Sequence, residues 1–528
     1  MNRKTFLGNA ALASGALLLS GLAKGVAQEA IHRSLPKEKT EEKEVIVIGS
    51  GYGGAVAALR LAEKGHKVTL LEMGLNWEKS GQKFSTMLHP GNSAAWLRNR
   101  TIAPFFNLFP LKKFTGALDR WDFDNIKIWM GRGVGGGSLV NGGMAVLPRR
   151  DYFREILPQL NDAVFYEKYF PLVQKELQVN VASEAFLADC RWYKFSRVGE
   201  EQARAAGFKT VRVPNVYDFD YMEAECRGDV PRSALAGEVI YGNNYGKASL
   251  DKSYLKKAAA TGNLEILDLH EVEHLTRNSD DTYTLDVKVI NTSGAEVARK
   301  TIHTPKVFLA AGVMGTLKLL LRSAARKGLP IDDQVGRKWG NNGNFMTGRN
   351  WVNAFSGGTG LNHSTIPVGG IDNWDDPEHP FFTEIAPLPM GLNAATTLYL
   401  MLNRVPQLDH VGYDTAADRL TLRWSDENTA PMLRNAKFFI KKMNKANGGT
   451  RAHLLFHNGW GPDVCYHPLG GVALGAATDA FGRLNGHQNL YVVDGSLIPG
   501  TIGVNPFLTI TAVAEYCLEH ILEQDFRV

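Results

Sequence analysis

Apolar residues near the N-terminus follow a pattern that predicts a βαβ unit. Residues Val45–Ile48 are continuously apolar and end in glycine, which is typical of a buried parallel strand. Alanine and leucine then recur at helical spacing from Gly53 to Lys64, and a second apolar run follows from Lys67 to Glu72. We therefore expect a strand, a helix and a second strand that pairs with the first.

Later segments extend this unit into a nucleotide-binding domain and predict a second, smaller domain. Strand-like alternation over residues 264–289 and the run Val307–Ala311 predict further strands of a Rossmann-like nucleotide domain, residues 44–339. Residues 75–127 show little periodicity and predict a lid loop. Tryptophan, proline and isolated apolar strands over residues 340–461 predict a smaller substrate domain with a mainly antiparallel sheet. A strand at 491–493 and a helix at 508–523 return the chain to the first domain, which thus takes up residues 462–528.

Size and composition fit a folded α/β enzyme. The chain has 528 residues, 44% hydrophobic and 21% charged, which favours two domains and excludes disorder and fibres. A net charge of +5 over 59 basic and 54 acidic residues is too balanced for nucleic-acid binding. The four cysteines are far apart and form no CxxC pair, so we expect free core thiols and no metal site. Nothing in the sequence indicates a protein partner.

The first 27 residues predict an export signal. Arg3 and Lys4 precede an apolar run from Ala10 to Leu22, and small residues follow near Ala27. The run is shorter than the roughly 18 residues that a membrane span needs, which favours cleavage over anchoring. Residues 3–7 resemble a twin-arginine signal with lysine in the second place, a route for folded, cofactor-loaded proteins. We expect a secreted or periplasmic protein.

A dinucleotide-binding motif lies directly between the first strand and its helix. Its glycines, Gly49, Gly51 and Gly54, form GxGxxG, and Tyr52 and Gly53 lie inside it. Such glycines allow a tight turn, close approach of a pyrophosphate and close helix packing. Glu72 ends the second strand, where its carboxylate can accept hydrogen bonds from a ribose diol. NAD, NADP and FAD all use this motif.

The segment Gly131–Met144 favours FAD. It contains too many glycines for the interior of a helix or strand, whereas bare backbone can lie against a large flat ring. A flexible linker would carry serine and charge rather than Val134, Leu139 and Val140. Residues 242–247 look like a phosphate loop but lack its spacing and its hydroxyl residue. Neither HExxH nor GxSxG occurs, so zinc and serine hydrolysis are not indicated.

Two late segments hold polar side chains in rigid surroundings. His467 lies in CYHPLGG and Asn505 in GVNPF. Together with the GxGxxG motif, GRGVGGGSLVNGGM and VVDGSLIPG, these segments resemble the glucose-methanol-choline family of flavoenzymes and, within it, bacterial cholesterol oxidases that bind FAD non-covalently. WYKFSRV, VPNVYDFDYM and SALAGEVIYGNNYGKASLDKSYL are similar to that subfamily in particular. The resemblance covers about residues 44–525.

The resemblance implies FAD-dependent oxidation of 3β-hydroxysterols by O2, with H2O2 as a product, followed by isomerisation of the 5-en-3-one to the 4-en-3-one. His467 would receive the alcohol proton, Asn505 would orient the alcohol, and Glu384 would be the base of the isomerisation. Phe382 and Tyr466 would line the substrate pocket. The implied FAD contacts, besides the motif glycines, are Tyr52, Gly53, Glu72, Gly137, Asn141, Gly142, Met144, Val272, Gly495 and Phe507.

Departures from the family pattern lie near the substrate. Leu388, Met390 and Asn393 differ from the expected residues, and the apolar segment Phe105–Phe109 of the lid could touch a membrane surface or simply pack inside. Three alternatives stay open: a dehydrogenase with another electron acceptor, a choline- or sugar-type alcohol oxidase, and a non-catalytic flavin or sterol carrier.

Overall fold

The computed structural model describes residues 39–80, 96, 113–235, 242–350, 358–360, 363–364, 366–388, 396–405, 408–451 and 463–526. The predicted signal segment, the lid residues Phe105–Phe109, Met390 and Asn393 lie outside these residues. Among the helices that the structure describes, none has the length and apolar character needed to span a membrane.

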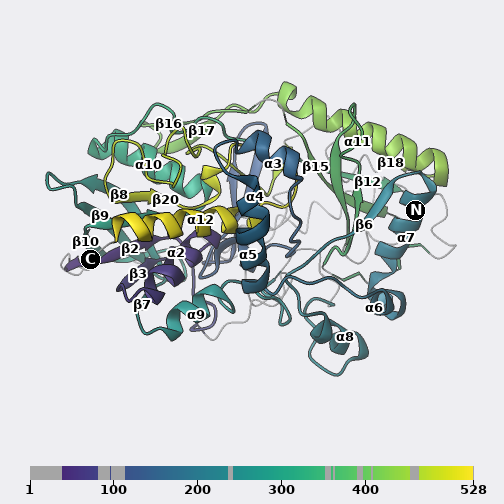
Figure 1. Ribbon diagram of the computed structural model, residues 1–528, viewed down its shortest axis with the longest axis horizontal. Coiled ribbons are helices and arrows are strands. Elements are labelled where there is room, and N and C mark those ends of the chain that lie inside the picture. The colour runs from purple at the N-terminus through teal and green to yellow at the C-terminus, as the bar shows by residue number, and fades with distance from the viewer. Residues whose placement is uncertain are drawn as a thin grey trace, which may run out of the picture. The chain divides into compact units, whose positions relative to one another are not determined.

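A five-stranded parallel sheet forms the centre of the nucleotide-binding part (Figure 1). The order is β20-β11-β2-β3-β7, so strands from both ends of the chain belong to one sheet, with β11 between β20 and β2. Every residue of β2 and β3 is buried, as their continuous apolar runs predict. The strands are β2 (Val45–Ile48), β3 (Val68–Leu71), β7 (Leu264–Leu267), β11 (Lys306–Leu309) and β20 (Leu490–Val492).

Helices and a second sheet surround the parallel sheet. Helix α12 packs on α2, which brings the C-terminal segment against the first βαβ unit (Figure 1). Helix α10 packs on β8, a strand of a four-stranded sheet in the order β1-β10-β9-β8. The bounds are α2 (Tyr52–Glu63), α9 (Tyr254–Ala260), α10 (Val313–Lys327), α12 (Phe507–Asp525), β1 (Lys39–Glu42), β8 (His270–Arg277), β9 (Tyr283–Ile290) and β10 (Glu296–Thr304).

A six-stranded antiparallel sheet forms the second part of the fold, in the order β18-β12-β15-β14-β13-β6. Helices α7 and α11 pack against it, and every residue of β14 and β15 is buried. The predicted α/β fold with an antiparallel second sheet is confirmed. The bounds are β6 (Lys209–Arg212), β12 (Asn344–Asn350), β13 (Gly369–Asp372), β14 (Phe381–Ala386), β15 (Thr396–Asn403), β18 (Thr450–Arg451), α7 (Lys194–Ala205) and α11 (Asp426–Asn447).

Two segments differ from the sequence-based expectation. Strand β6 lies within the range predicted for the nucleotide domain, yet it is an edge strand of the antiparallel sheet. The range predicted to be a lid loop contains β4 (Leu118–Asp122) and the start of β5 (Ile126–Gly131), which form a hairpin. Strand β19 (Asp463–Cys465) pairs in parallel with β5 and leads directly to His467.

The remaining elements connect these sheets. They are the helices α3 (Arg150–Ile156), α4 (Asp162–Val164), α5 (Phe170–Glu176), α6 (Glu184–Asp189) and α8 (Phe219–Arg227), the short helical turns η1 (Gly136–Leu139), η2 (Phe165–Tyr169), η3 (Arg191–Tyr193) and η4 (Gly495–Leu497), and the hairpin β16 (Val411–Asp414) and β17 (Arg419–Leu422).

Candidate functional site

The turn after β2 can be built only with glycine. Gly49 has φ +98°, and a Cβ there would lie 2.3 Å from the carbonyl oxygen of Ala310, just after β11. A Cβ at Gly53 would lie 1.7 Å from the carbonyl oxygen of Val493, just after β20. Both distances are far below van der Waals contact, so helix α2 begins directly against the carboxyl ends of the parallel strands.

This turn borders a large cavity. Gly51 and Gly137 both line a cavity of about 780 Å³, and a Cβ at either position would meet no atom within 4 Å. Bare backbone therefore faces open space at the start of α2, which is how backbone N–H groups approach a pyrophosphate. Gly54 does not line the cavity. A Cβ at this position would lie 2.0 Å from the carbonyl oxygen of Gly49, so Gly54 faces the backbone of the turn. Its role is helix packing.

The glycine-rich segment 131–144 is a packed wall and not a linker. A Cβ at Gly136 would lie 2.7 Å from the Cα of Gly51, so the segment rests on the nucleotide turn. The hydroxyl of Ser138 accepts a hydrogen bond from the backbone of Leu250 at 3.0 Å. Leu139 is fully buried. The segment thus has one defined shape, as a flat ligand requires.

Side chains complete the wall next to this segment. The Asn141 amide donates to the Tyr52 hydroxyl at 2.6 Å, and Tyr52 stacks on Phe507 with ring centroids 4.9 Å apart. The Asn141 oxygen is buried without a hydrogen bond within the described part of the chain, so it can serve a ligand. Every residue predicted to contact the cofactor lines the cavity, with the exception of Gly54.

Glu72 lines the cavity but already has chain donors. Its carboxylate accepts hydrogen bonds from the Ser50 hydroxyl at 2.6 Å and from the backbone N–H groups of Ser50, Gly74 and Gly133 at 3.1, 2.8 and 3.3 Å. Four donors match the capacity of a carboxylate. In the structure Glu72 therefore joins the nucleotide turn to the glycine-rich segment, and its binding of a ribose diol stays a prediction.

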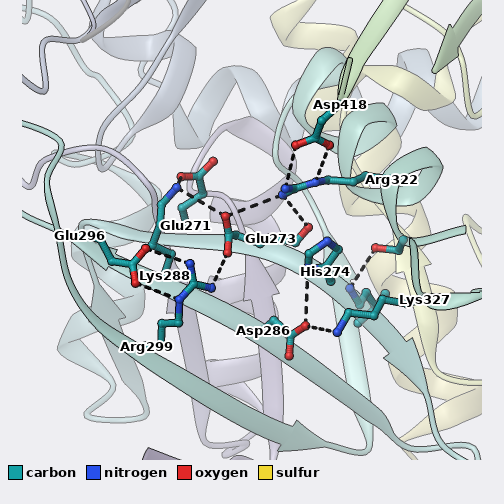
Figure 2. A network of polar contacts seen from close by, with 12 residues as sticks. Glu271, Glu273, His274, Asp286, Lys288, Glu296, Arg299, Arg322, Lys327 and Asp418 are labelled. Carbon is teal, nitrogen blue, oxygen red and sulfur yellow. Dashed lines mark hydrogen bonds and ion pairs between the residues drawn. The ribbon is translucent and has the colours of Figure 1, made fainter. Parts of the chain in front are cut away.

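The sequence reasoning missed a charged network around β8 and α10 (Figure 2), of which Glu271, Glu273 and Arg322 line the cavity. Arg322 on α10 forms two 2.9 Å bonds to Asp418, and Arg299 pairs with Glu273 at 2.8 Å. Lys288 pairs with Glu271 at 2.6 Å. Lys288 and Arg299 thus tie β8, which carries Val272, to β9 and β10, and Arg322 ties it to α10 by donating to the carbonyl of Glu273 at 3.3 Å. The sequence signal for this network was the run His-Glu-Val-Glu-His over residues 270–274, where titratable side chains flank Val272 in a predicted strand.

Glu384 lies in the middle of β14 and is 1% exposed. The side chain of Asn505, which lines the cavity, lies next to its carboxyl group. Burial raises the pKa of Glu384 from 4.5 to about 8, and the neighbouring Asn505 side chain acts weakly against this rise. Glu384 is not among the residues that line the cavity, but two of its neighbours are, Asn505 and its cross-strand partner Leu400 on β15.

The tautomer of His467 follows from Asn344 on β12. The Asn344 oxygen accepts backbone N–H bonds from Tyr466 at 3.0 Å and His467 at 2.9 Å, so its amide nitrogen faces His467 Nδ1, 3.0 Å away. An amide nitrogen only donates, so Nδ1 accepts and the proton lies on Nε2. Burial lowers the pKa of His467 to about 3. The imidazole is therefore a neutral donor, in contrast to the predicted role as proton acceptor.

Apolar side chains form the wall beside His467. Leu388, Leu398 and Leu400 pack with Met346 and Tyr466, and all of these residues line the cavity. Phe382 does not: it shares a face of β14 with Glu384 but lies two residues away, where Met144, Val213 and Leu402 cover it. The structure thus brings Tyr466 to the predicted pocket and leaves Phe382 in the core.

Three family models match the chain. The model "FAD dependent oxidoreductase" matches residues 44–337, more than half of the chain, and "GMC oxidoreductase, C-terminal" and "GMC oxidoreductase" match residues 342–457 and 405–514. The chain belongs to the GMC family of FAD-dependent oxidoreductases. FAD is thus the cofactor of this GMC oxidoreductase, and the bare backbone at Gly51 and Gly137 fits it.

Relatives of this GMC oxidoreductase support the same assignment. A cholesterol oxidase of Acinetobacter baumannii is 24% identical over 550 residues, covering 90% of this chain and 94% of that protein. A cholesterol oxidase of Mycobacterium tuberculosis is 25% identical, covering 89% and 90%. Among solved structures, a formate oxidase (14% identity, TM-score 0.64, 92% of this chain and 99% of that chain) and a fungal aryl-alcohol oxidase (13%, 0.64, 92% and 100%) share the fold.

Proposed function

We propose that this GMC oxidoreductase oxidises the 3β-hydroxyl group of sterols such as cholesterol, passes the electrons to O2 to give H2O2, and isomerises the 5-en-3-one to the 4-en-3-one. The observation that carries the proposal is the group formed by neutral His467, Asn505 and Glu384 beside an apolar wall. The cholesterol oxidases among its relatives act in its favour.

The wall favours a large apolar alcohol. Leu388, Leu398 and Leu400 offer no hydrogen bonds, whereas a sugar needs donors and acceptors for several hydroxyl groups. Each buried CH2 group of a sterol would contribute about 0.8 kcal/mol to binding. This supports a sterol over a sugar or choline as the substrate.

In the oxidation, an alcohol loses a hydride and a proton. FAD, bound non-covalently, supplies the hydride acceptor. The Nε2–H group of His467 would donate to the hydroxyl oxygen, and the amide of Asn505 would orient it. Because His467 has its acceptor atom occupied by Asn344, the carboxylate of Glu384 is the group that we propose as proton acceptor.

In the isomerisation, Glu384 would first release the alcohol proton to solvent, and its carboxylate would then remove a proton from C4 of the ketone and return it to C6. A pKa of about 8 suits a group that must both take up and release a proton near neutral pH. An aqueous carboxyl, with a pKa of 4.5, would be a much weaker base.

A panel of alcohols tests the substrate class. We expect the FAD-loaded protein in air to form peroxide and a conjugated ketone with cholesterol, and neither product with choline or glucose. Turnover of cholesterol with an artificial electron acceptor but without peroxide would favour a sterol dehydrogenase of the same family. Turnover of choline or glucose alone would overturn the sterol assignment, and no turnover with flavin bound would favour a carrier.

We also propose export of the protein and contact with a sterol-bearing membrane, on the sequence of residues 1–27 and 105–109. A mature secreted protein that begins near residue 28 would support export, and an uncleaved intracellular chain would contradict it. Vesicle binding should weaken in Phe105→Ser and Phe106→Ser, and unchanged binding would reject membrane contact through this segment.

A further inference from the structure

A buried lysine lies directly behind the glycine-rich wall of the FAD cavity. Lys247 is 1% exposed and is not among the residues that line the cavity. It ends the stretch 242–247, which looks like a phosphate loop in the sequence. Its amine instead donates hydrogen bonds to the carbonyl oxygen of Asn141 and, at 3.4 Å, to that of Gly242. An amine that is shielded from the cavity and bonded to two carbonyl groups serves the protein backbone and not a phosphate.

The segment that carries Lys247 backs the wall at two points. The backbone N–H of Leu250 donates to the Ser138 hydroxyl at 3.0 Å, and Lys247 holds the carbonyl of Asn141, three residues after Ser138. Lys252 belongs to the same segment, but its amine donates to two carbonyl groups of that segment, at 2.7 and 3.3 Å. Lys247 is therefore the lysine that joins this segment to the wall.

The bond from Lys247 sets the direction of the next peptide N–H. In a trans peptide the C=O and N–H bonds point in opposite directions, and the described residues contain no cis peptide. The Asn141 carbonyl points to Lys247, away from the cavity, so the N–H of Gly142 points toward the cavity that Gly142 lines. Within the described part of the chain this N–H has no acceptor, although Gly142 is buried. A buried N–H of this kind needs an acceptor from a ligand.

The neighbours of Gly142 place this N–H at the reacting end of the cavity. Met144, two residues later, packs with Phe382, which lies two residues before Glu384 on β14. Asn505, next to Glu384, lines the same cavity. The flavin ring must lie at this end to take a hydride from an alcohol held there. The N–H of Gly142 is thus directed at the ring and not at the adenosine half of FAD.

We propose that Lys247 is a positioning residue for FAD: by holding the Asn141 carbonyl, it aims the N–H of Gly142 at the flavin ring. A donor directed at the ring stabilises the electron-rich reduced flavin more than the oxidised flavin, so it raises the midpoint potential. Burial and the nearby Lys252 lower the pKa of Lys247 well below 10.5, yet both the amine and the ammonium group donate hydrogen bonds. The inference requires FAD but not the proposed sterol, so either can fail alone.

The test compares FAD-loaded Lys247→Met and Lys252→Met with the parent. Methionine fills the space of lysine without an N–H donor, and Lys252→Met is the matched control, because its lost bonds lie inside the segment. In Lys247→Met we expect the flavin midpoint potential, measured by reductive titration against a reference dye, to fall. The Kd for FAD should rise about tenfold. Lys252→Met should keep both values near those of the parent. Parent values in Lys247→Met, or the same change in both variants, would overturn the proposal.

Hydrogen exchange tests the same contact without a substitution. In the parent, FAD should slow exchange of the Gly142 amide by about tenfold or more, because the ring accepts its hydrogen bond. Mass spectrometry with fragmentation of a peptide over residues 140–145 measures this amide. In Lys247→Met, FAD should no longer slow it. Equal exchange with and without FAD in the parent would overturn the proposal, also where Lys247→Met fails to fold.

Discussion

Replacement of Glu384 by glutamine tests the central carboxylate through both stability and catalysis. Burial shifts the pKa of Glu384 from 4.5 to about 8, a change of about 3.5 units that corresponds to about 5 kcal/mol. Below pH 4.5 the carboxyl group is protonated in both the folded and the unfolded chain. Between pH 4.5 and about 8 only the unfolded chain ionises, so the folded parent loses stability as the pH rises. Glu384→Gln lacks this loss.

The variant should therefore gain stability relative to the parent, by up to about 5 kcal/mol above pH 8 and by little below pH 4.5. Thermal unfolding of both FAD-loaded proteins over this pH range measures the difference. The matched control is Glu515→Gln, another buried carboxylate, which forms two 2.8 Å bonds to Arg60. The substitution removes the buried charge opposite Arg60 and leaves it only the more exposed Glu63 and the more distant Glu176, so we expect destabilisation. A difference between Glu384→Gln and the parent that does not change with pH would refute the reasoning.

The same variant should lose the isomerisation. With the 5-en-3-one supplied directly, we expect the rate to fall by about 10²–10⁴, the usual contribution of a general base. In the parent enzyme the rate should rise with pH and level off above about 8, because only about a tenth of Glu384 is ionised at pH 7. An unchanged rate in the variant, or a flat profile in the parent, would exclude Glu384 as the base.

Three further substitutions probe the rest of the site. Gly137→Ala should weaken FAD binding about tenfold or more, measured by flavin fluorescence, while the Tm of the flavin-free chain stays unchanged, because the added methyl group meets only the cavity. Asn344→Asp should raise the pKa of His467 by placing a carboxylate at Nδ1, so that the pH profile of alcohol oxidation acquires a second titration, of His467, beside the titration of Glu384 that the parent shows. Phe382→Ala should destabilise the fold by about 3–5 kcal/mol in chemical denaturation with little change in the KM for sterol, since Phe382 lies in the core; a large rise in KM with unchanged stability would place it in the pocket instead.

The nucleotide-binding half could be predicted because its constraints are local. The apolar run Val45–Ile48 and the glycines after it specify strand, turn and helix within a short stretch. The structure shows why residue 53 must be glycine: a Cβ there would collide with the carbonyl oxygen of Val493, which comes from the far end of the chain. The sequence predicted the residue, but not the neighbour that requires it.

Long-range contacts account for what the sequence did not reveal. The exposure of Phe382 depends on Met144 and Val213, which come from other segments, and the tautomer of His467 depends on Asn344. Helix α11 was missed although Ser425 and Asn428 form a capping box, because Pro431 in its second turn argues against a helix.

The most direct test of the proposed sterol oxidation is the visible flavin absorbance of the FAD-loaded enzyme when cholesterol is added without air and oxygen is then readmitted. We expect bleaching with cholesterol, recovery with oxygen, and one H2O2 and one conjugated ketone for each flavin that recovers. Flavin that stays oxidised in the presence of cholesterol would contradict sterol oxidation by this enzyme.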